Sequence, residues 1–408
     1  MNLFQKIVSI SLILSPILNI YGWGKYNFSF IIILFLSVIN IFMISRNQKK
    51  IPKTLYIFFV FWLLSHFISS YNIHFGLIRI FLSIILFYNC IKLPFFIKAY
   101  RNIAFICIIF FFIQEIGYYF SGIRIVGILQ FMPIALNIDN ISYYLMNMAE
   151  YERSSSFFSE PAHFAQFLLP ILTIELFAFN TIKWKYVGII LITLLLTQSG
   201  NALFGLVVIL ASYFFRISHN KRINFSQRFI MTITSVAIVA ILGYSFTNSD
   251  IGKKLLSRAD TIQNTTDFTY ASSGFIRIWR GYYVFEEFDP VYKFIGNDNP
   301  DYISTKINSS IVSVFFNEEH DRYLNGVQQF LISTGYIGVL IFIIFIVKSW
   351  KKTNYCGKTL LMTMIAILFI ASIYFTDSML VPMTLSFLMP SNTILKEYNN
   401  KIFQQYEA

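Results

Sequence analysis

The chain has 408 residues, of which 56% are hydrophobic and only 13% are charged, and its net charge is +12. Soluble proteins average about 25% charged residues. Repeated apolar runs of about 17 or more residues exclude an ordinary soluble protein and predict an all-α polytopic membrane protein. The basic excess does not indicate nucleic-acid binding, because the lysines and arginines lie where membrane topology needs them.

Twelve predicted spans organise residues 1–408 as a single transmembrane domain with both ends in the cytoplasm. They lie near 5–21, 27–45, 54–70, 75–91, 103–120, 162–181, 186–198, 202–215, 229–246, 327–347, 359–376 and 378–394. The first span ends without a small-residue cleavage site, so we expect it to be retained. Most basic residues then fall in inner segments, whereas the short outer segments hold only Lys25, Arg124 and Arg153. This asymmetry follows the positive-inside rule and fixes the orientation.

Two apolar stretches need interpretation. Residues 125–138 are short and contain Pro133, so we predict an interfacial or re-entrant segment, not a span. Residues 186–215 are interrupted by the polar run 197–201, and basic clusters at both ends predict two short spans joined by an outward turn. Each half reaches about 20 Å against a hydrocarbon thickness of about 30 Å. The turn can therefore lie below the outer surface, where it is tolerable only if it lines a cavity.

A polar segment leads into the predicted helix at 162–181. Pro161 suits the first position of a helix, with Ser159 or Glu160 as the cap. A helix start carries unpaired N–H groups and the positive end of the peptide dipole, and Arg153 lies shortly upstream. At an outer membrane face this combination suits an anionic lipid headgroup or a diphosphate. The alternative is that Glu160 and Pro161 only cap a helix and that Arg153 is solvated.

Two outer segments are large, 121–160 and 247–326, and the second is long enough for a small subdomain between spans nine and ten. Within it, Gly274–Phe288 is predicted to be an amphipathic helix that places Arg277 and Arg280 on one face, where they can converge on one anion. Trp279 offers a ring face of the kind that packs on sugars. The alternative is an interfacial helix with aromatic anchors and snorkelling arginines.

Other ionisable residues lie at or within the predicted spans. His320, just before the tenth span, can exchange a proton near neutral pH, although a lone histidine is also often structural. Arg79, Glu115 and Glu175 lie inside spans, where a charge needs a partner or a water-filled cavity. We expect Arg79 and Glu115, both in the outer third, to pair. The sequence has no Walker, HExxH or Cys/His metal motif, so we predict neither a metal nor a cofactor.

These residues together resemble the bacterial O-antigen and capsule repeat-unit polymerases, which are relatives of the O-antigen ligases. Residues 153–161 are similar to the family's Arg-x-x-Ser-x-Phe-x-Glu-Pro signature with one inserted residue, and LLLTQSGNALFGL (194–206) is similar to its Thr-x-Ser hairpin. The outer loop with paired arginines and Ile295-Gly296-Asn297 is also similar. It closes with His320 and a span that bears Gly335, Gly338 and Phe342.

Two positions depart from the family pattern. Gly200 and Asn201 follow the hairpin serine where members often have an arginine, and Asp321 follows His320 where relatives commonly have asparagine.

The resemblance implies glycosyl transfer at the outer face of the bacterial plasma (inner) membrane. The donor would be a growing glycan on undecaprenyl diphosphate and the acceptor a lipid-linked repeat unit, with a flippase and a chain-length regulator as further partners. Arg153, Arg277 and Arg280 would bind the diphosphate, with Arg79, Ser199 and Trp279 in support. His320 or Glu160 would act as the base; we favour His320, with Glu160 organising Arg153.

Two other functions compete with polymerisation. An O-antigen ligase, which transfers finished glycan to lipid A core, would share the fold and similar arginines. A glycolipid flippase would also have about twelve spans, but it should show related halves and a central charged cavity, and we find neither pattern in the sequence.

Overall fold

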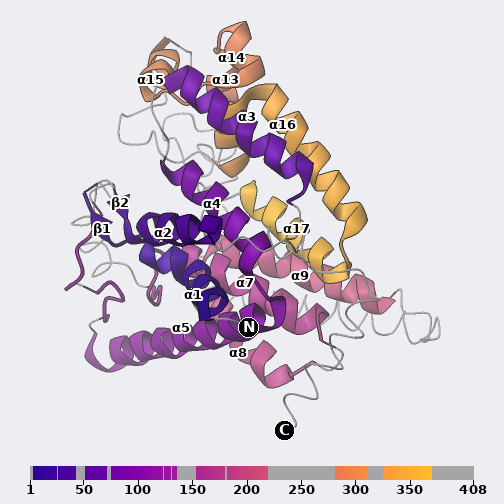
Figure 1. The fold of residues 1–408 in the computed structure, drawn as a ribbon. Coiled ribbons are helices and arrows are strands. Elements are labelled where there is room, and N and C mark those ends of the chain that lie inside the picture. Colours follow the sequence, from indigo (N-terminus) through magenta and orange to yellow (C-terminus); the bar gives the residue numbers. More distant parts are fainter. Residues whose placement is uncertain are drawn as a thin grey trace, which may run out of the picture.

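The computed structural model describes residues 3–24, 26–42, 51–70, 75–122, 124–129, 131–135, 153–179, 182–218, 281–309 and 325–369. Within these ranges the chain is mostly helical, so the fold is all-α (Figure 1). The predicted spans 229–246 and 378–394 lie outside the described residues.

Each predicted span that lies at least partly within the described ranges overlaps an apolar helix. These helices are α1 Leu3–Leu18, α2 Phe28–Phe42, α3 Lys53–Ser70, α4 Phe75–Cys90, α5 Leu93–Ser121, α7 Pro161–Phe177, α8 Trp184–Leu196, α9 Gly200–Ser218, α16 Gly326–Lys352 and α17 Tyr355–Leu368. Among the described helices, α5 and α16 are long and apolar enough to cross a membrane, and the other apolar helices are shorter.

A small hairpin joins α1 to α2. Its strands, β1 Gly22–Trp23 and β2 Tyr26–Asn27, pair antiparallel, and Tyr21 forms a further bridge with Ile134. The sequence analysis did not predict this hairpin. The described residues of 124–135 contain no helix, in agreement with the prediction that this stretch is not a span.

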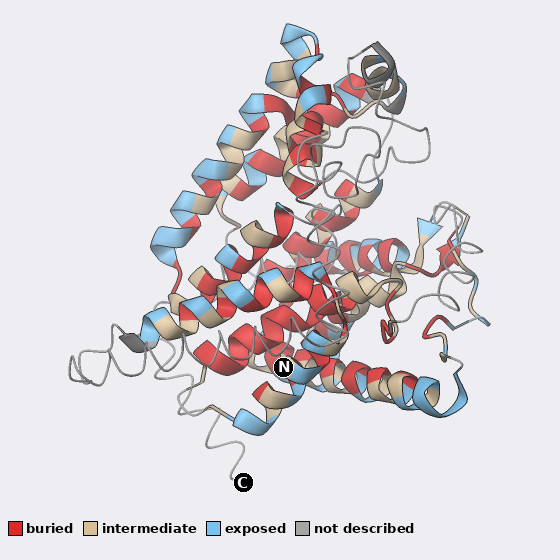
Figure 2. Cartoon of the chain, turned by 180° about the vertical axis from the view of Figure 1, so that it is seen from behind, coloured by how far each residue is buried: buried red, intermediate tan, exposed pale blue. Residues whose placement is uncertain are grey.

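Helix α7 lies in the middle of the hydrophobic core. All its residues from Phe164 to Phe177 are buried, and it packs against α5, α8, α9 and α17. Figure 2 shows the same pattern across the molecule, with buried residues concentrated in the middle and exposed faces on the outlying helices. A helix that is buried all round is one enclosed by its neighbours, so the segment before Pro161 is held on a rigid central element.

Helices α3 and α16 pack side by side (Figure 1). Their contact is aromatic, with Phe58 of α3 close to both Phe330 and Phe342 of α16. Helix α16 is broken at Gly335, whose φ of 62° and ψ of −169° are not helical.

Three short helices follow in the chain: α13 Gly281–Glu286, α14 Pro290–Ile295 and α15 Pro300–Ser309. Helices α13 and α14 pack against α16, and α15 packs against α13. They share a small apolar cluster, in which Val284, Phe285 and Phe288 pack with Ile332 of α16. The described part of the second large outer segment is therefore fixed on α16.

Candidate functional site

The motif before the sixth predicted span forms the helix start that the sequence predicts. Helix α7 begins at Pro161, and Glu160 occupies the N-cap position with extended backbone angles of φ −141° and ψ 150°. The Glu160 side chain does not cap the helix. In the first turn, Ser159 Oγ lies 2.9 Å from His163 Nδ1.

Three buried serines shape the loop that leads to this helix. Ser156 has a left-handed φ of 56°; its backbone N–H donates to Gln114 Oε1 of α5 over 2.8 Å, and its hydroxyl donates to Cys107 O over 2.7 Å. Ser155 Oγ donates to Phe158 O over 2.7 Å, and Ser154 is also buried. Because the serines are buried and two of them bond within the protein, they build the loop, while Arg153 and Glu160 at its two ends remain partly exposed.

Arg153 links this loop to the turn between α8 and α9. Its Nη1 donates to Gln198 O over 3.3 Å, and Gln198 adopts a left-handed φ of 48°. The turn is largely buried, since Thr197 is 0% and Ser199 3% exposed. Ser199 O accepts the Leu203 N–H of α9 over 3.1 Å. Two sequence motifs, separated by most of α7 and all of α8, thus meet at one guanidinium group.

The turn that Arg153 contacts leads directly into a helix start. Helix α9 begins at Gly200, directly after the turn that Arg153 contacts, and α7 begins at Pro161, shortly after Arg153 in the chain. Each helix start contributes roughly half a positive charge from its unpaired N–H groups. A guanidinium group beside the start of α9 favours phosphate-like oxygens, for which arginine is geometrically suited.

The remaining residues assigned to the diphosphate or to proton transfer lie outside the described residues; they are Arg277, Trp279, Arg280 and His320. The described residues that flank them meet at the start of α16. A Cβ placed on Gly281 would lie 2.6 Å from Gln328 Cβ, so the two backbones are close there. Gln328 also completes a capping box with Asn325, whose Oδ1 accepts the Gln328 N–H over 2.9 Å.

The prediction that Arg79 pairs with Glu115 is wrong, because each of them has a different partner. Glu115 pairs with Arg124, with 3.5 Å between Oε1 and Nη2. Arg79 is buried in α4, and its Nη1 donates to Asn19 Oδ1, which also accepts from Asn27 Nδ2 over 2.6 Å. The loop after α5 folds back to bring Arg124 to Glu115, and the turn after α1 supplies the partner of Arg79. Arg79 therefore supports the hairpin region, and its described bonds do not link it to Arg153.

Glu175 has the partner that its burial requires. Its Oε1 lies 2.5 Å from Arg101 Nε, and the Glu175 side chain is 1% exposed. Burying an unpaired carboxylate would be strongly unfavourable. This pair joins α5 to α7 and is structural.

No protein-family model and no curated protein sequence matches this chain. Its function must therefore be argued from its own residues. Within the ranges that the structure describes, no three His, Cys, Asp or Glu side chains gather closely enough to hold a metal ion.

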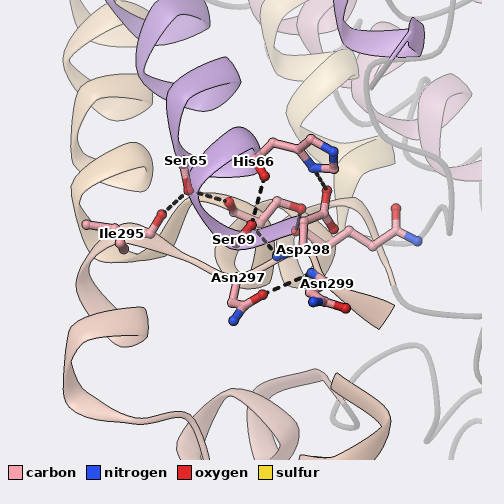
Figure 3. Close-up of polar contacts among 9 residues, drawn as sticks. Ser65, His66, Ser69, Ile295, Asn297, Asp298 and Asn299 are labelled. Atoms are coloured by element: carbon pink, nitrogen blue, oxygen red, sulfur yellow. Dashed lines mark hydrogen bonds and ion pairs between the residues drawn. The ribbon is translucent and has the colours of Figure 1, made fainter. Parts of the chain in front are cut away.

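A second polar cluster, which the sequence analysis missed, lies between the end of α3, the connection from α14 to α15 and the break in α16 (Figure 3). His66 Nδ1 lies 3.1 Å from Asp298 Oδ2, although the two residues are 232 positions apart. Ser69 Oγ accepts the Asp298 backbone N–H over 3.3 Å. The sequence signal for this cluster was the polar group Ser65, His66 and Ser69 at the end of an otherwise apolar helix. That signal does not indicate which residues these side chains contact.

Proposed function

We propose that the chain is a glycosyltransferase that polymerises undecaprenyl-diphosphate-linked repeat units into O-antigen or capsular polysaccharide. In this proposal it crosses the bacterial plasma membrane about twelve times, carries an outer loop subdomain at 247–326, and works at the outer face without a metal. The proposal rests on the resemblance of its motifs to the polymerase family and on the geometry around Arg153.

The observation that carries the proposal is the hydrogen bond from Arg153 to Gln198 O. It joins the two most characteristic motifs of the resemblance, the loop before Pro161 and the Thr197–Ser199 turn, at the predicted outer ends of α7, α8 and α9. A shared binding site would require the two motifs to lie together, so this contact supports the proposal.

The proposed reaction needs positive charge beside the leaving diphosphate, and the residues around Arg153 can provide it. Diphosphate on an anomeric carbon is a good leaving group, so stabilisation of its developing charge contributes most to the rate. Arg153 and the N-termini of α7 and α9 provide fixed positive charge without a metal. In our proposal Arg277 and Arg280 complete the diphosphate site. Arg280 directly precedes Gly281, which is anchored against Gln328 of α16.

Proton transfer from the acceptor hydroxyl is the second requirement. Glu160 sits at the N-cap of α7, at the other end of the loop that begins with Arg153. We assign Glu160 to the organisation of Arg153. We assign the role of base to His320, as the resemblance implies.

The test uses the purified full-length protein in lipid vesicles with its undecaprenyl-diphosphate-linked repeat unit as the only substrate. The wild type should form a ladder of lipid-linked polymer, and Arg153→Ala, Arg277→Ala and Glu160→Ala should abolish it while the protein remains in the membrane. Lys293→Ala removes the same charge from α14, has no role in the proposed site, and should leave the ladder intact. Wild-type polymer length in all three site variants would refute the site.

The same system distinguishes a ligase. A ligase would form no ladder from repeat units alone but would transfer glycan to added lipid A core. In cells, loss of a polymerase leaves single repeat units on the surface carrier, whereas loss of a ligase accumulates long lipid-linked polymer.

A further inference from the structure

The loop that begins with Arg153 is held on α5 by one buried side-chain amide. Gln114 is 2% exposed. Its Oε1 accepts the Ser156 N–H over 2.8 Å, and its Nε2 donates to Ile125 O over 2.8 Å and to Ser156 O over 3.3 Å. A primary amide has two N–H donors and a carbonyl acceptor, so both ends of this amide are used. Gln114 therefore joins the loop before α7 to the segment that follows α5.

The backbone that Gln114 holds is strained. Among the described residues, a positive φ at a residue other than glycine occurs at Ser156, with 56°, and at Gln198, with 48°. Such angles are unfavourable for residues with a Cβ and persist where the surrounding contacts enforce them. Both residues flank one contact, because Ser156 lies three residues after Arg153, and Gln198 O accepts from Arg153 Nη1. The contact of Arg153 is thus framed by two enforced turns.

A second close contact confines Ser156. A Cβ placed on Gly127 would lie 1.7 Å from Ser156 O, so the backbone of Gly127 lies directly against the loop. The segment that contains Gly127 is itself anchored, since the Leu129 N–H donates to the Tyr21 hydroxyl over 2.9 Å. Ser156 O therefore contacts both the Gln114 amide and the backbone at Gly127, and a change at either place should move the loop.

We propose that Gln114 is a positioning residue for Arg153 in the glycosyl transfer; this rests on the proposed function. The Gln114 amide fixes the left-handed turn at Ser156, the turn sets the path of the chain at Arg153, and the guanidinium group is thereby held beside Gln198 O. Gln114 is buried and acts through the loop without touching the substrate. A cation that is fixed in advance need not reorganise while negative charge develops on the leaving diphosphate.

The test measures polymer formation by the full-length protein in vesicles that contain the lipid-linked repeat unit. Gln114→Met replaces the amide with an unbranched apolar side chain. A misplacement of about 1 Å can cost about 100-fold in rate. We therefore expect kcat to fall by about 10- to 100-fold, with a KM close to the wild-type value, because Arg153 is needed most as charge develops.

Tyr100→Phe is the matched control for a lost buried hydrogen bond. Tyr100 is also buried in α5, and its hydroxyl donates to Phe167 O of α7 over 2.6 Å. This bond joins the same two helices that flank the loop, but it does not involve the loop. Tyr100→Phe should lower thermal stability and retain the wild-type kcat.

Two double variants separate a positioning role from a packing role. Ser156→Gly and Ser156→Ala, each combined with Gln114→Met, both lose the hydroxyl bond to Cys107 O. Glycine adopts a positive φ readily, whereas alanine keeps the Cβ that makes this conformation unfavourable. If Gln114 acts by holding the turn, the glycine double variant should recover most of the lost kcat and the alanine double variant should not. Equally slow double variants would overturn the proposal.

Gly127→Ala moves the same turn without changing Gln114, and it carries the test if Gln114→Met does not fold. Its methyl group would push against Ser156 O, so kcat should fall here too. Gly117→Ala is its control, because a Cβ on Gly117 of α5 would meet the Ile125 side chain at an ordinary 3.4 Å. This control should keep the wild-type kcat.

Failure of the inference can be told from failure of the proposed function. A wild-type kcat in both Gln114→Met and Gly127→Ala would overturn the assignment of Gln114 and leave the proposed function standing. If the wild-type protein forms no polymer from lipid-linked repeat units, the proposed function is wrong, and the inference falls with it.

Discussion

The break in α16 can be tested by adding one methyl group. Gly335 has a φ of 62° and a ψ of −169°, a combination that is essentially restricted to glycine. A Cβ at this position would lie 2.4 Å from Phe294 O and 2.6 Å from Gly296 N, both backbone atoms of the segment docked in the break. Gly335→Ala therefore has to change the backbone angles and also displace that segment.

The expected cost has two parts. A non-glycine residue in this region of φ/ψ space costs about 1–3 kcal/mol. Displacement of the docked segment weakens the bond from Asn297 N to Ile332 O, now 2.8 Å long, which contributes about 1 kcal/mol more. We expect Gly335→Ala to lower the free energy of unfolding by about 2–4 kcal/mol in total.

The assay is denaturant unfolding of the purified protein in lipid-containing micelles, with Gly188→Ala as the matched control. Gly188 lies inside α8, and a Cβ there would meet no atom within 4 Å. Alanine should stabilise that helix by up to about 1 kcal/mol. If the two alanine variants unfold at the same denaturant concentration, the steric reasoning about the break is wrong.

Two further predictions concern ion pairs. Glu175→Ala should destabilise the protein by about 3–5 kcal/mol, because it leaves Arg101 without its carboxylate partner. The double change Glu175→Leu with Arg101→Met should cost much less. Equal losses of stability in the same unfolding assay would show that the pair is not coupled. Hydrogen bonds from Lys306 and Tyr302 lower the pKa of Asp289, so the stability it contributes is fully present above the carboxyl's unfolded value of about 3.9 and is lost as pH falls through the lower folded value. The stability difference between the wild type and Asp289→Asn should therefore be constant from pH 7 to pH 5 and shrink below about pH 4, and a difference that persists at pH 2 would contradict this.

Local signals in the sequence predicted the helix starts and breaks around Arg153. Pro161 fixes its own φ and lacks an N–H, so it marks the first turn of α7, and Glu160 takes the cap position as expected. The polar run 197–201 likewise interrupts an apolar stretch and becomes the turn between α8 and α9. The hydrogen bond that joins Arg153 to this turn was not itself predicted.

Contacts that depend on tertiary placement could not be predicted. His66 and Asp298 lie on different elements, and nothing local to either residue specifies the other. The pairing of Arg79 with Glu115 was inferred from depth in the predicted membrane, but depth does not fix rotation about the helix axis, and loop residues supplied the partners. The break at Gly335 carries no proline, and its cause is the docked segment at Phe294–Asn297, which is remote in sequence.

The predicted roles of Arg277, Arg280, Trp279 and His320 stay predictions, since these residues fall outside the described ranges. The structure limits their positions only through chain connectivity, because the chain resumes at Gly281 on one side and at the capping box of Asn325 on the other.

The shortness of the apolar helices has a consequence for the lipid environment. At 1.5 Å per residue the 13 residues of α8 extend about 20 Å and the 16 residues of α1 about 24 Å, against about 30 Å of hydrocarbon. In the proposed membrane setting, the lipid tails around these helices must compress to match them. The length of the lipid acyl chains should then affect the protein, which should be most stable and most active in vesicles made from short-chain phospholipids.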